Sequence, residues 1–249
     1  MNETRASSLK AEPFSAAQAV AAGMDFAELQ LGATGLFWNE YRPEDAACRI
    51  WHWRDGVAKC LTPTGFSVRS RVYEYGGGAF CLTPDGVVFV SEADQQLYRQ
   101  TLDSSPEALT SGECRYGDVN FADGQILAVE ENGDQHRLVA IDLADGTRRL
   151  LAEGADFYAA PVISPDGARL AWIEWSRPHQ PWTSPRLMVA ERCGQSFAAP
   201  SCVAGDAIEE SIQQPRFDAK GQLYCLTDRA GFWQPYVESV DGFKPLPSV

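Results

Sequence analysis

The segment Ser164-Pro165-Asp166-Gly167, followed by the run Leu170-Ala171-Trp172-Ile173, decides the fold of this chain. An Asp-Gly pair between apolar runs predicts a β-hairpin, because Gly tolerates a positive φ and Asp caps the turn locally. The same order of turn and apolar run recurs along the chain. The further copies are 83–86 before 87–90, 122–124 before 126–129, and 218–221 before 223–226, and a degenerate copy precedes 36–38.

Each copy continues with a polar loop, a third β-prone run, a second turn and a short closing run. The anchors of this pattern recur every ~40–55 residues, the length of one four-stranded propeller blade. A lone sheet of this kind is apolar on both faces, and radial packing of several sheets buries those faces. Almost no helical periodicity separates the strands, which argues against a parallel α/β sheet.

We therefore predict an all-β fold, a β-propeller of about five four-stranded blades that form an incomplete ring. A lead-in over residues 1–24 is expected to contain a short helix from Ser15 to Gly23, where the sequence is rich in alanine. The expected blades cover roughly 25–64, 72–111, 114–152, 156–205 and 212–249.

The composition excludes several classes of partner. The 249 residues carry a formal net charge of −13, which repels a nucleic-acid backbone and an anionic membrane surface. The seven cysteines occur singly, without a Cys-x-x-Cys pair, and this favours buried thiols in a reducing compartment. No signal peptide is recognisable, and no run approaches the ~18 apolar residues that span a bilayer. The expected location is the cytoplasm, with no nucleic-acid or membrane partner.

The segment Arg69-Ser70-Arg71-Val72-Tyr73-Glu74-Tyr75-Gly76-Gly77-Gly78-Ala79 resembles a motif of a known family. It is similar to the N-terminal propeller of the prolyl oligopeptidase family of serine peptidases, in the dipeptidyl aminopeptidase or acylaminoacyl peptidase branch, whose repeats are TolB-like. The resemblance runs in family order from about Pro13 to the end of the chain. The other matching segments are 38–44, 94–98, 115–118, 156–158, 164–167, 178–182 and 228–233.

The resemblance implies a parent peptidase in which the propeller caps a C-terminal α/β-hydrolase domain and admits only short peptides. The catalytic Ser, Asp and His of the family belong to that hydrolase domain. In this chain, the segments 65–69 and 194–198 each lack the second Gly of a Gly-x-Ser-x-Gly nucleophile elbow, so no catalytic residue is expected. Family propellers have about seven or eight blades, so five units predict a truncated product or an excerpt.

Glu74 and Tyr75 are the first candidates for substrate contact. A carboxylate suits the free α-amine of a peptide, and a phenol offers a hydrogen bond and apolar surface. The alternative is structural: Glu74 pairs with Arg69 or Arg71 and ties two blades together. Arg71 is included among the candidate substrate-binding residues.

Arg115 and Trp182 complete the candidate substrate-binding set. Arg115 with Asp118 forms either an inter-blade ion pair or a site for a peptide carboxylate. Trp182 and Trp233 lie on loop-like segments, where aromatic residues either contact ligands or pack blade on blade. The family commonly has Asp after the equivalent of Trp182, and Thr183 stands there instead, which puts a substrate contact at this position in doubt.

The three glycines Gly76 to Gly78 do not form a phosphate-binding loop, because no Lys-Ser/Thr pair and no helix follows them. No His, Cys or Asp spacing matches a zinc or calcium site, so neither a metal nor a cofactor is expected. The leading functional hypothesis is a non-catalytic propeller that gates and positions short peptides. The alternatives are a stand-alone protein-interaction scaffold and a propeller glycosidase, although the Asp-box pattern of the latter fails at 164–172.

Overall fold

The computed structural model describes residue 15 and residues 23–246. These residues form five antiparallel sheets and contain no helix. The predicted short helix from Ser15 to Gly23 lies outside the described residues, apart from its two end residues. The all-β prediction is confirmed.

Each sheet is built from strands that follow one another in sequence, which is the order of a propeller blade. Blade 1 contains β1 (Asp25–Gly32), β2 (Gly35–Arg42), β3 (Ala47–Arg54) and β4 (Val57–Cys60), and blade 2 contains β5 (Phe80–Thr83), β6 (Gly86–Val90), β7 (Leu97–Thr101) and β8 (Glu107–Ala108). Blade 3 contains β9 (Arg115–Ala122), β10 (Gln125–Asn132), β11 (Gln135–Asp142) and β12 (Arg148–Ala152). Blade 4 contains β13 (Phe157–Ile163), β14 (Arg169–Trp175), β15 (Arg186–Cys193), β16 (Ser196–Phe197) and β17 (Ser201–Ala204). Blade 5 contains β18 (Ile212–Phe217), β19 (Leu223–Thr227), β20 (Gln234–Ser239) and β21 (Gly242–Pro245).

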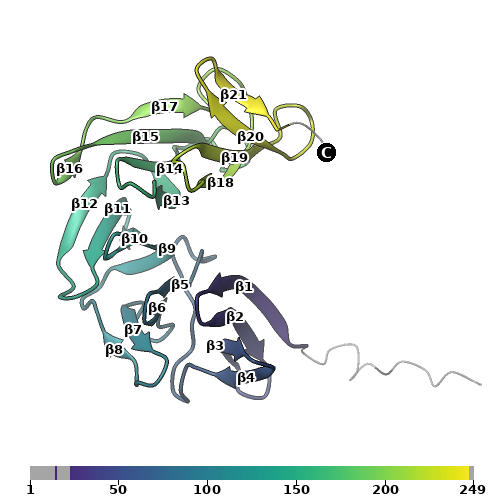
Figure 1. Ribbon diagram of the computed structural model, residues 1–249, viewed down its shortest axis with the longest axis vertical. Helices are drawn as coiled ribbons and strands as arrows, with labels where there is room; N and C mark the ends of the chain where they lie inside the picture. Colours follow the sequence, from purple (N-terminus) through teal and green to yellow (C-terminus); the bar gives the residue numbers. More distant parts are fainter. Residues whose placement is uncertain (1–14, 16–22, 247–249) are drawn as a thin grey trace, which may run out of the picture.

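The blades stand side by side around a common centre, with the first strand of each blade innermost (Figure 1). The inner strands β1, β5, β9, β13 and β18 contact one another in that order. Figure 1 shows that the ring is open between blade 1 and blade 5. The prediction of five blades in an incomplete ring is therefore confirmed.

Apolar cores lie between the blades, as radial packing requires. Among the described residues, four clusters of buried side chains join blade 1 to blade 2, blade 2 to 3, blade 3 to 4, and blade 4 to 5. The residues that represent these clusters are Phe89, Ile126, Trp172 and Leu187, each with an exposed fraction of 1% or less. Both faces of the middle blades are therefore covered.

The Asp-Gly turns of blades 3 and 4 have the positive φ that favours glycine. Gly167 has a φ of 71°, and the Asp166 carboxylate accepts hydrogen bonds from the Ser164 hydroxyl (2.6 Å) and the Ala168 N–H (3.0 Å). At the turn of blade 3, Asp123 and Gly124 both have positive φ, the type I′ pattern that matches the twist of a hairpin.

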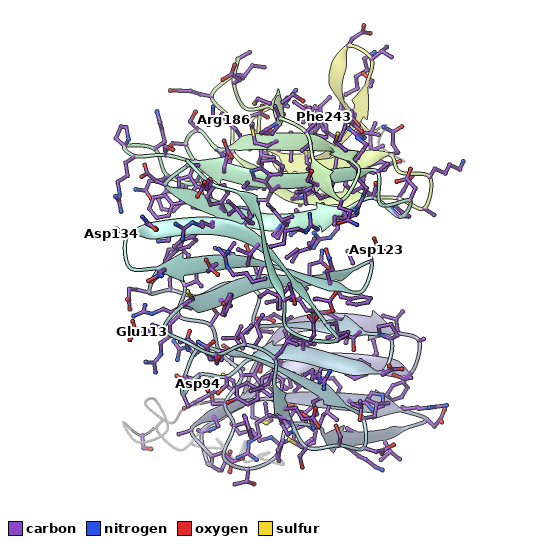
Figure 2. The ribbon with its side chains drawn as sticks, turned by 90° about the vertical axis from the view of Figure 1, so that its left-hand side faces the viewer. Asp94, Glu113, Asp123, Asp134, Arg186 and Phe243 are labelled. Carbon is purple, nitrogen blue, oxygen red and sulfur yellow. The ribbon has the colours of Figure 1, made fainter. Side chains whose placement is uncertain are left out.

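The connections lie on two opposite faces of the arc. Figure 2 shows Asp94, Glu113 and Asp134 along one face and Asp123 on the other. Asp94 and Asp134 lie between the second and third strands of their blades, and Glu113 lies between two blades. We call this side the loop face, and the side with the first hairpin turns, which includes Asp123, the hairpin face. The inner strands begin at the loop face.

The inner strands share an irregularity at one level. A β-bulge interrupts the register at Glu28, Asp118, Ala160 and Gln214, and each of these four residues has a positive φ between 49° and 55°. Each bulge lies a few residues before its hairpin turn, so the four bulges surround the axis at a similar height. Two of the four carry a carboxylate, and these two matter for the site described next.

Candidate functional site

The connection from blade 1 to blade 2 crosses the loop face and reaches three blades. We call residues 69–78, which contain the family-like motif, the strap. The Ser70 hydroxyl donates a hydrogen bond to the Tyr116 carbonyl of blade 3 (2.7 Å). The Arg71 N–H donates to the Gln95 side chain of blade 2 (2.6 Å). These bonds fix the strap at the mouth of the arc.

Tyr73 is the deepest anchor of the strap. Its hydroxyl donates to the Tyr158 carbonyl of blade 4 (3.0 Å) and accepts from the Tyr158 N–H (2.9 Å). Its ring meets Phe157 and Trp175 edge to face, with centroids 5.2 Å and 6.2 Å away. Burial raises the pKa of the Tyr73 phenol well above its usual range, so the hydroxyl remains a donor. Among the described residues, Tyr73 thus joins the blade 1–blade 2 connection directly to blade 4.

The strap turns sharply between its anchors. Tyr73 and Glu74 have φ values of 58° and 67°, and Gly76 has 84°. Non-glycine residues in this region cost about 1–3 kcal/mol each and persist where the surroundings hold them. Here the Tyr73 N–H donates to the Glu131 carboxylate (2.5 Å), and the Gly76 N–H donates to the Val72 carbonyl (2.8 Å). The turn directs Tyr75 outward, and that side chain is 71% exposed.

The charged residues of the strap are paired. Glu74 accepts from Arg115 (2.6 Å), which also lies 3.3 Å from Glu131, so the partner of Glu74 is Arg115 rather than Arg69 or Arg71. The hydrogen bond from Arg115 holds the pKa of the Glu74 carboxyl below its usual value. Arg71 pairs with Glu92 of blade 2 (3.1 Å). The structure thus joins Arg115 to Glu74, and it does not pair Arg115 with Asp118.

A hollow of about 330 Å³ opens beside the strap, between blades 3, 4 and 5. We call it the aromatic hollow. Its wall is mainly apolar, and Asp118 and two glutamines supply most of its polar side chains. The residues that define it are Tyr73, Tyr75, Asp118, Tyr158, Trp175 and Ile212. A pocket of this size and character suits one apolar side chain with a few polar atoms around it.

Trp182 lies on the connection from β14 to β15, beside this hollow. The preceding residue, Pro181, lines the hollow, and its carbonyl accepts a hydrogen bond from the Ser211 hydroxyl (3.4 Å). The Trp182 side chain is 65% exposed, and Trp233 on the equivalent connection of blade 5 is 47% exposed. Both indoles are therefore available for contact at the loop face.

A second hollow of about 470 Å³ follows the axis, and all five inner-strand regions line it. We call it the axial hollow. Glu28 of β1 accepts hydrogen bonds from the Ala79 N–H (2.9 Å) and the Phe80 N–H (3.2 Å) of blade 2. Asp118 of β9 accepts from Gly78 (3.2 Å) and from Ala160 of blade 4 (3.0 Å). The bulge carboxylates therefore link neighbouring blades around the axis.

Sequence reasoning found the strap but missed its anchors. Tyr73 stands inside the quoted motif between two candidates, and its neighbours gave no sign that its hydroxyl reaches blade 4. From the sequence, Asp118 is expected only as a partner for Arg115. The signal for Asp118 would have been the bulge, in which Asp118 and Val119 lie opposite the single residue Ala128, and sequence periodicity does not resolve one inserted residue.

The described residues contain no group of His, Cys, Asp and Glu side chains that would hold a metal ion. In the part of the chain that the structure covers, no helix is long and apolar enough to cross a membrane.

Comparison with known proteins shows which solved structures share this fold. No family model and no curated protein matches the chain. Among solved structures, a puromycin-hydrolyzing peptidase of Mycobacterium tuberculosis is 32% identical, with a TM-score of 0.85 over 96% of this chain and 40% of that one. A puromycin hydrolase is 26% identical, with a TM-score of 0.83 over 96% of this chain and 41% of that one.

A putative TolB from Agrobacterium tumefaciens is 11% identical, with a TM-score of 0.64 over 88% of this chain and 79% of that one, and it supports the propeller fold alone. The chain spans about 40% of the length of the two peptidases. The resemblance carried by the strap motif is confirmed: this chain is a β-propeller of the kind found in peptidases of the prolyl oligopeptidase family.

Proposed function

We propose that the chain is the non-catalytic propeller of a serine peptidase of the dipeptidyl aminopeptidase or acylaminoacyl peptidase kind. In this role it admits short peptides and positions them for a C-terminal α/β-hydrolase domain. The observation that carries the proposal is the likeness of 96% of this chain to 40% of a puromycin-hydrolyzing peptidase. Propellers serve many functions, so the proposal rests on this likeness together with the site, and not on the fold alone.

The strap supports the positioning role. It crosses the loop face near the axis, and its contacts with blades 2, 3 and 4 hold it rigidly. In our proposal, Tyr75 and Trp182 touch the peptide, because both side chains are exposed beside the aromatic hollow. Arg71, Glu74 and Arg115 act mainly through their ion pairs, which keep the strap turn in place. A rigid support of this kind lowers the entropy lost on binding.

The axial hollow supports the gating role. Bulged backbone from four blades surrounds it, and the Glu28 and Asp118 carboxylates accept hydrogen bonds that join blade 1 to blade 2 and blade 3 to blade 4. A passage bounded by backbone widens only if the blades move apart. Extended or short peptides would pass along such a passage, whereas folded proteins would be excluded. We also place the chain in the cytoplasm, because the seven cysteines are free thiols.

Binding without turnover tests this function. Puromycin and a series of peptides from two to about ten residues would be titrated into the purified full chain by isothermal calorimetry. We expect binding that weakens as peptides lengthen, with the ligand recovered intact by mass spectrometry. Tyr75→Ala and Trp182→Ala should each weaken binding by roughly five- to tenfold, about 1–1.4 kcal/mol.

A matched control is Glu107→Gln, which alters only an exposed ion pair with Arg99 on the edge of blade 2. This variant should bind as the parent chain does. Absence of binding for every ligand, or hydrolysis that a serine-directed inhibitor abolishes, would refute the proposed function.

A further inference from the structure

A row of charged side chains crosses blade 3 beside the strap. Arg115, Glu131 and His136 lie directly opposite one another on β9, β10 and β11. Side chains in such cross-strand positions have Cβ atoms about 5 Å apart and interact directly. The Glu131 carboxylate lies 3.3 Å from Arg115 and accepts a hydrogen bond from the Tyr73 N–H of the strap (2.5 Å). The row therefore holds the strap at Tyr73, where the backbone turns.

His136 packs between blade 3, blade 4 and the strap. Its side chain is 8% exposed, stacks on Phe157 with ring centroids 5.3 Å apart, and meets Tyr73 edge to face at 4.8 Å. Its Nδ1 contacts the Asp156 carbonyl. A carbonyl oxygen can only accept a hydrogen bond, so Nδ1 carries a proton and Nε2 is the nitrogen that can gain a second one. Nε2 lies 4.0 Å from Glu131 Oε2, the oxygen that accepts the Tyr73 N–H.

The other two histidines lack this arrangement. His52 Nε2 lies 3.0 Å from the Thr34 carbonyl, and its ring stacks on Phe37. His179 lies exposed on the connection from β14 to β15. Within the described residues, His136 is the one histidine with a carboxylate oxygen within 4.0 Å. Imidazoles change charge between about pH 5 and 8, so the charge at this contact can change in the physiological range.

The charges of the row do not balance when His136 is neutral. Arg115 serves two carboxylates, Glu74 at 2.6 Å and Glu131 at 3.3 Å. One negative charge is therefore in excess beside the strap, in a place that is partly shielded from water, since the Glu131 side chain is 11% exposed. A proton on His136 supplies the positive charge that the row lacks.

The other ionisable groups next to the imidazole ring are paired or neutral. The Asp156 carboxylate accepts a hydrogen bond from the Arg177 N–H (2.8 Å), so these two groups of opposite sign lie together on blade 4. Glu153, after β12, pairs with Arg137 (3.3 Å). The Tyr73 phenol stays neutral, because burial raises its pKa. The charge that a proton on the imidazole meets is therefore that of the row itself.

We propose that Glu131 and His136 are positioning residues of the peptide site, and that a proton on His136 tightens the strap. The protonated Nε2–H attracts Glu131 Oε2 and keeps this oxygen in place for the Tyr73 N–H. When the proton leaves to solvent, a lone pair faces the carboxylate, and Arg115 alone attracts Glu131. The hold on Tyr73 is then weaker. The proposal rests on the proposed function, because the strap positions a ligand only if peptides bind beside it.

The strap turn requires such support. Tyr73 and Glu74 both have a positive φ, which non-glycine residues keep only where the surroundings hold it. Tyr75 follows them and is 71% exposed beside the aromatic hollow. A looser turn leaves Tyr75 more conformations to lose when a peptide binds, so the affinity falls. We therefore expect peptide binding to strengthen as the pH falls from about 8 to about 5.5.

Amide hydrogen exchange of the full chain tests the contact without any ligand. The exchange rate of the Tyr73 N–H would be measured by NMR from about pH 5.5 to 8 and divided by its intrinsic rate at each pH. We expect the protection to be at least about threefold higher at the acidic end, the effect of one further ion pair. The Val90 N–H, which donates to the Ala79 carbonyl in blade 2 (2.8 Å), is the internal reference and should show no such change.

Two variants remove the charge and keep the hydrogen bonds. His136→Asn retains an N–H for the Asp156 carbonyl, and Glu131→Gln retains an oxygen for the Tyr73 N–H. In both, the protection of Tyr73 should stay at the level that the parent chain shows near pH 8. His179→Asn is the matched control and should keep the parent profile. A flat profile in the parent chain, as packing alone would give, would overturn the proposal. If His136→Asn does not fold, the profiles of the parent and of Glu131→Gln decide.

Calorimetry with phenylalanyl-glycyl-glycine then tests the positioning role. His136→Asn should bind this tripeptide about threefold less tightly than the parent near pH 5.5 and equally near pH 8, and the titration of the peptide itself cancels in this ratio. Equal binding by the two chains at both pH values would overturn the positioning role while the proposed function stands. Absence of binding in a chain whose Tyr73 amide shows the expected profile would overturn the proposed function, and the positioning role with it.

Discussion

Blades 1 and 4 carry the same Trp-x-Glu arrangement, but a neighbouring blade buries the tryptophan in blade 4 alone. In blade 4, Trp172 donates to Glu174 (2.9 Å), which also accepts from Arg186 (2.7 Å). In blade 1, Trp38 donates to Glu40 (2.8 Å), which also accepts from Arg42 (2.5 Å). The local chemistry is thus repeated in both blades.

The neighbours of the two tryptophans differ. Trp172 is 1% exposed, because the apolar face of blade 3 packs on it. Trp38 lies in a hollow of the open face of blade 1, beside Phe26, Leu29 and Trp53, which are 60%, 70% and 41% exposed. The comparison teaches that each blade forms its own polar network, while the burial of its aromatic residue depends on the preceding blade.

The largest expected difference comes from truncating the two tryptophans. Trp172→Ala should lower the free energy of unfolding by about 3–5 kcal/mol, because it opens a cavity between two blades. Trp38→Ala should cost about 1–2 kcal/mol, because it removes mainly contacts within one sheet, including a stacked pair with Trp51. Urea denaturation followed by circular dichroism measures both values. Equal losses of unfolding free energy in the two variants would contradict the prediction that packing by the preceding blade decides the cost.

Substitutions at Glu174 and Glu40 should differ less in their cost to the free energy of unfolding, and they test the indole hydrogen bonds alone. Glu174→Ala should cost about 3 kcal/mol, because the indole N–H of Trp172 is then left buried without a partner. Glu40→Ala should cost about 2 kcal/mol, since the indole N–H of Trp38 can turn to water. The same denaturation experiment applies. A larger loss of unfolding free energy for Glu40→Ala than for Glu174→Ala would show that burial by the neighbouring blade is not the deciding factor.

The bulge carboxylates extend the comparison to pH. Burial raises the pKa of both Glu28 in blade 1 and Asp118 in blade 3. A raised folded-state pKa means that the folded protein holds the proton more tightly, so this contribution to stability is present below the unfolded pKa and is lost as pH rises through the folded pKa.

Asp118→Asn and Glu28→Gln remove that dependence. Both variants should be less stable than the parent chain near pH 4, and the deficit should shrink toward pH 7 with a slope of at most about 1.4 kcal/mol per pH unit. Asp118 should show the larger overall deficit, because it joins blade 3 to both the strap and blade 4, whereas Glu28 joins blade 1 to blade 2 alone. Unfolding curves at a series of pH values test this, and a deficit that grows with pH would contradict it.

A substitution at Leu31 should have the smallest effect on the free energy of unfolding and the largest effect on self-association of the chain. The open face of blade 1 exposes Leu31 by 79%, and contiguous apolar surface of this kind promotes contact between molecules. Leu31→Asp should weaken self-association roughly tenfold, since burial of a leucine contributes about 1.5–3 kcal/mol. Val240→Asp, on the fully exposed turn between β20 and β21, is the matched control and should change nothing. Analytical ultracentrifugation decides, and a parent chain that stays monomeric at every concentration would contradict the prediction.

Much of the fold could be predicted from local chemistry. Glycine ends the first hairpin turn of every blade, and in blades 2, 3 and 4 an Asp precedes it directly, as in Asp166-Gly167. Alternating apolar runs between the turns then specify strands. These signals are local, so a single sequence contains them.

The site was less predictable because its contacts are not local. Glu74 has several arginines within reach along the chain, and only the path of the strap selects Arg115, 41 residues away in sequence. The contact of Tyr73 with Tyr158 spans 85 residues. The bulges at Ala160 and Gln214 precede prolines, yet Glu28 and Asp118 bulge without one, so no single residue type marks them. Contacts of this kind are settled by how the blades pack.

The repeated bulge also determines what can change at the axis. Because the extra residue bends the innermost strand alone, the width of the central aperture depends on main-chain geometry that the outer three strands do not share. At Glu28 and Asp118 the side chain also holds the neighbouring blade, so the bulges open to substitution at little risk are those at Ala160 and Gln214. At these two positions, selectivity at the aperture and durability of the blades can evolve as separate traits.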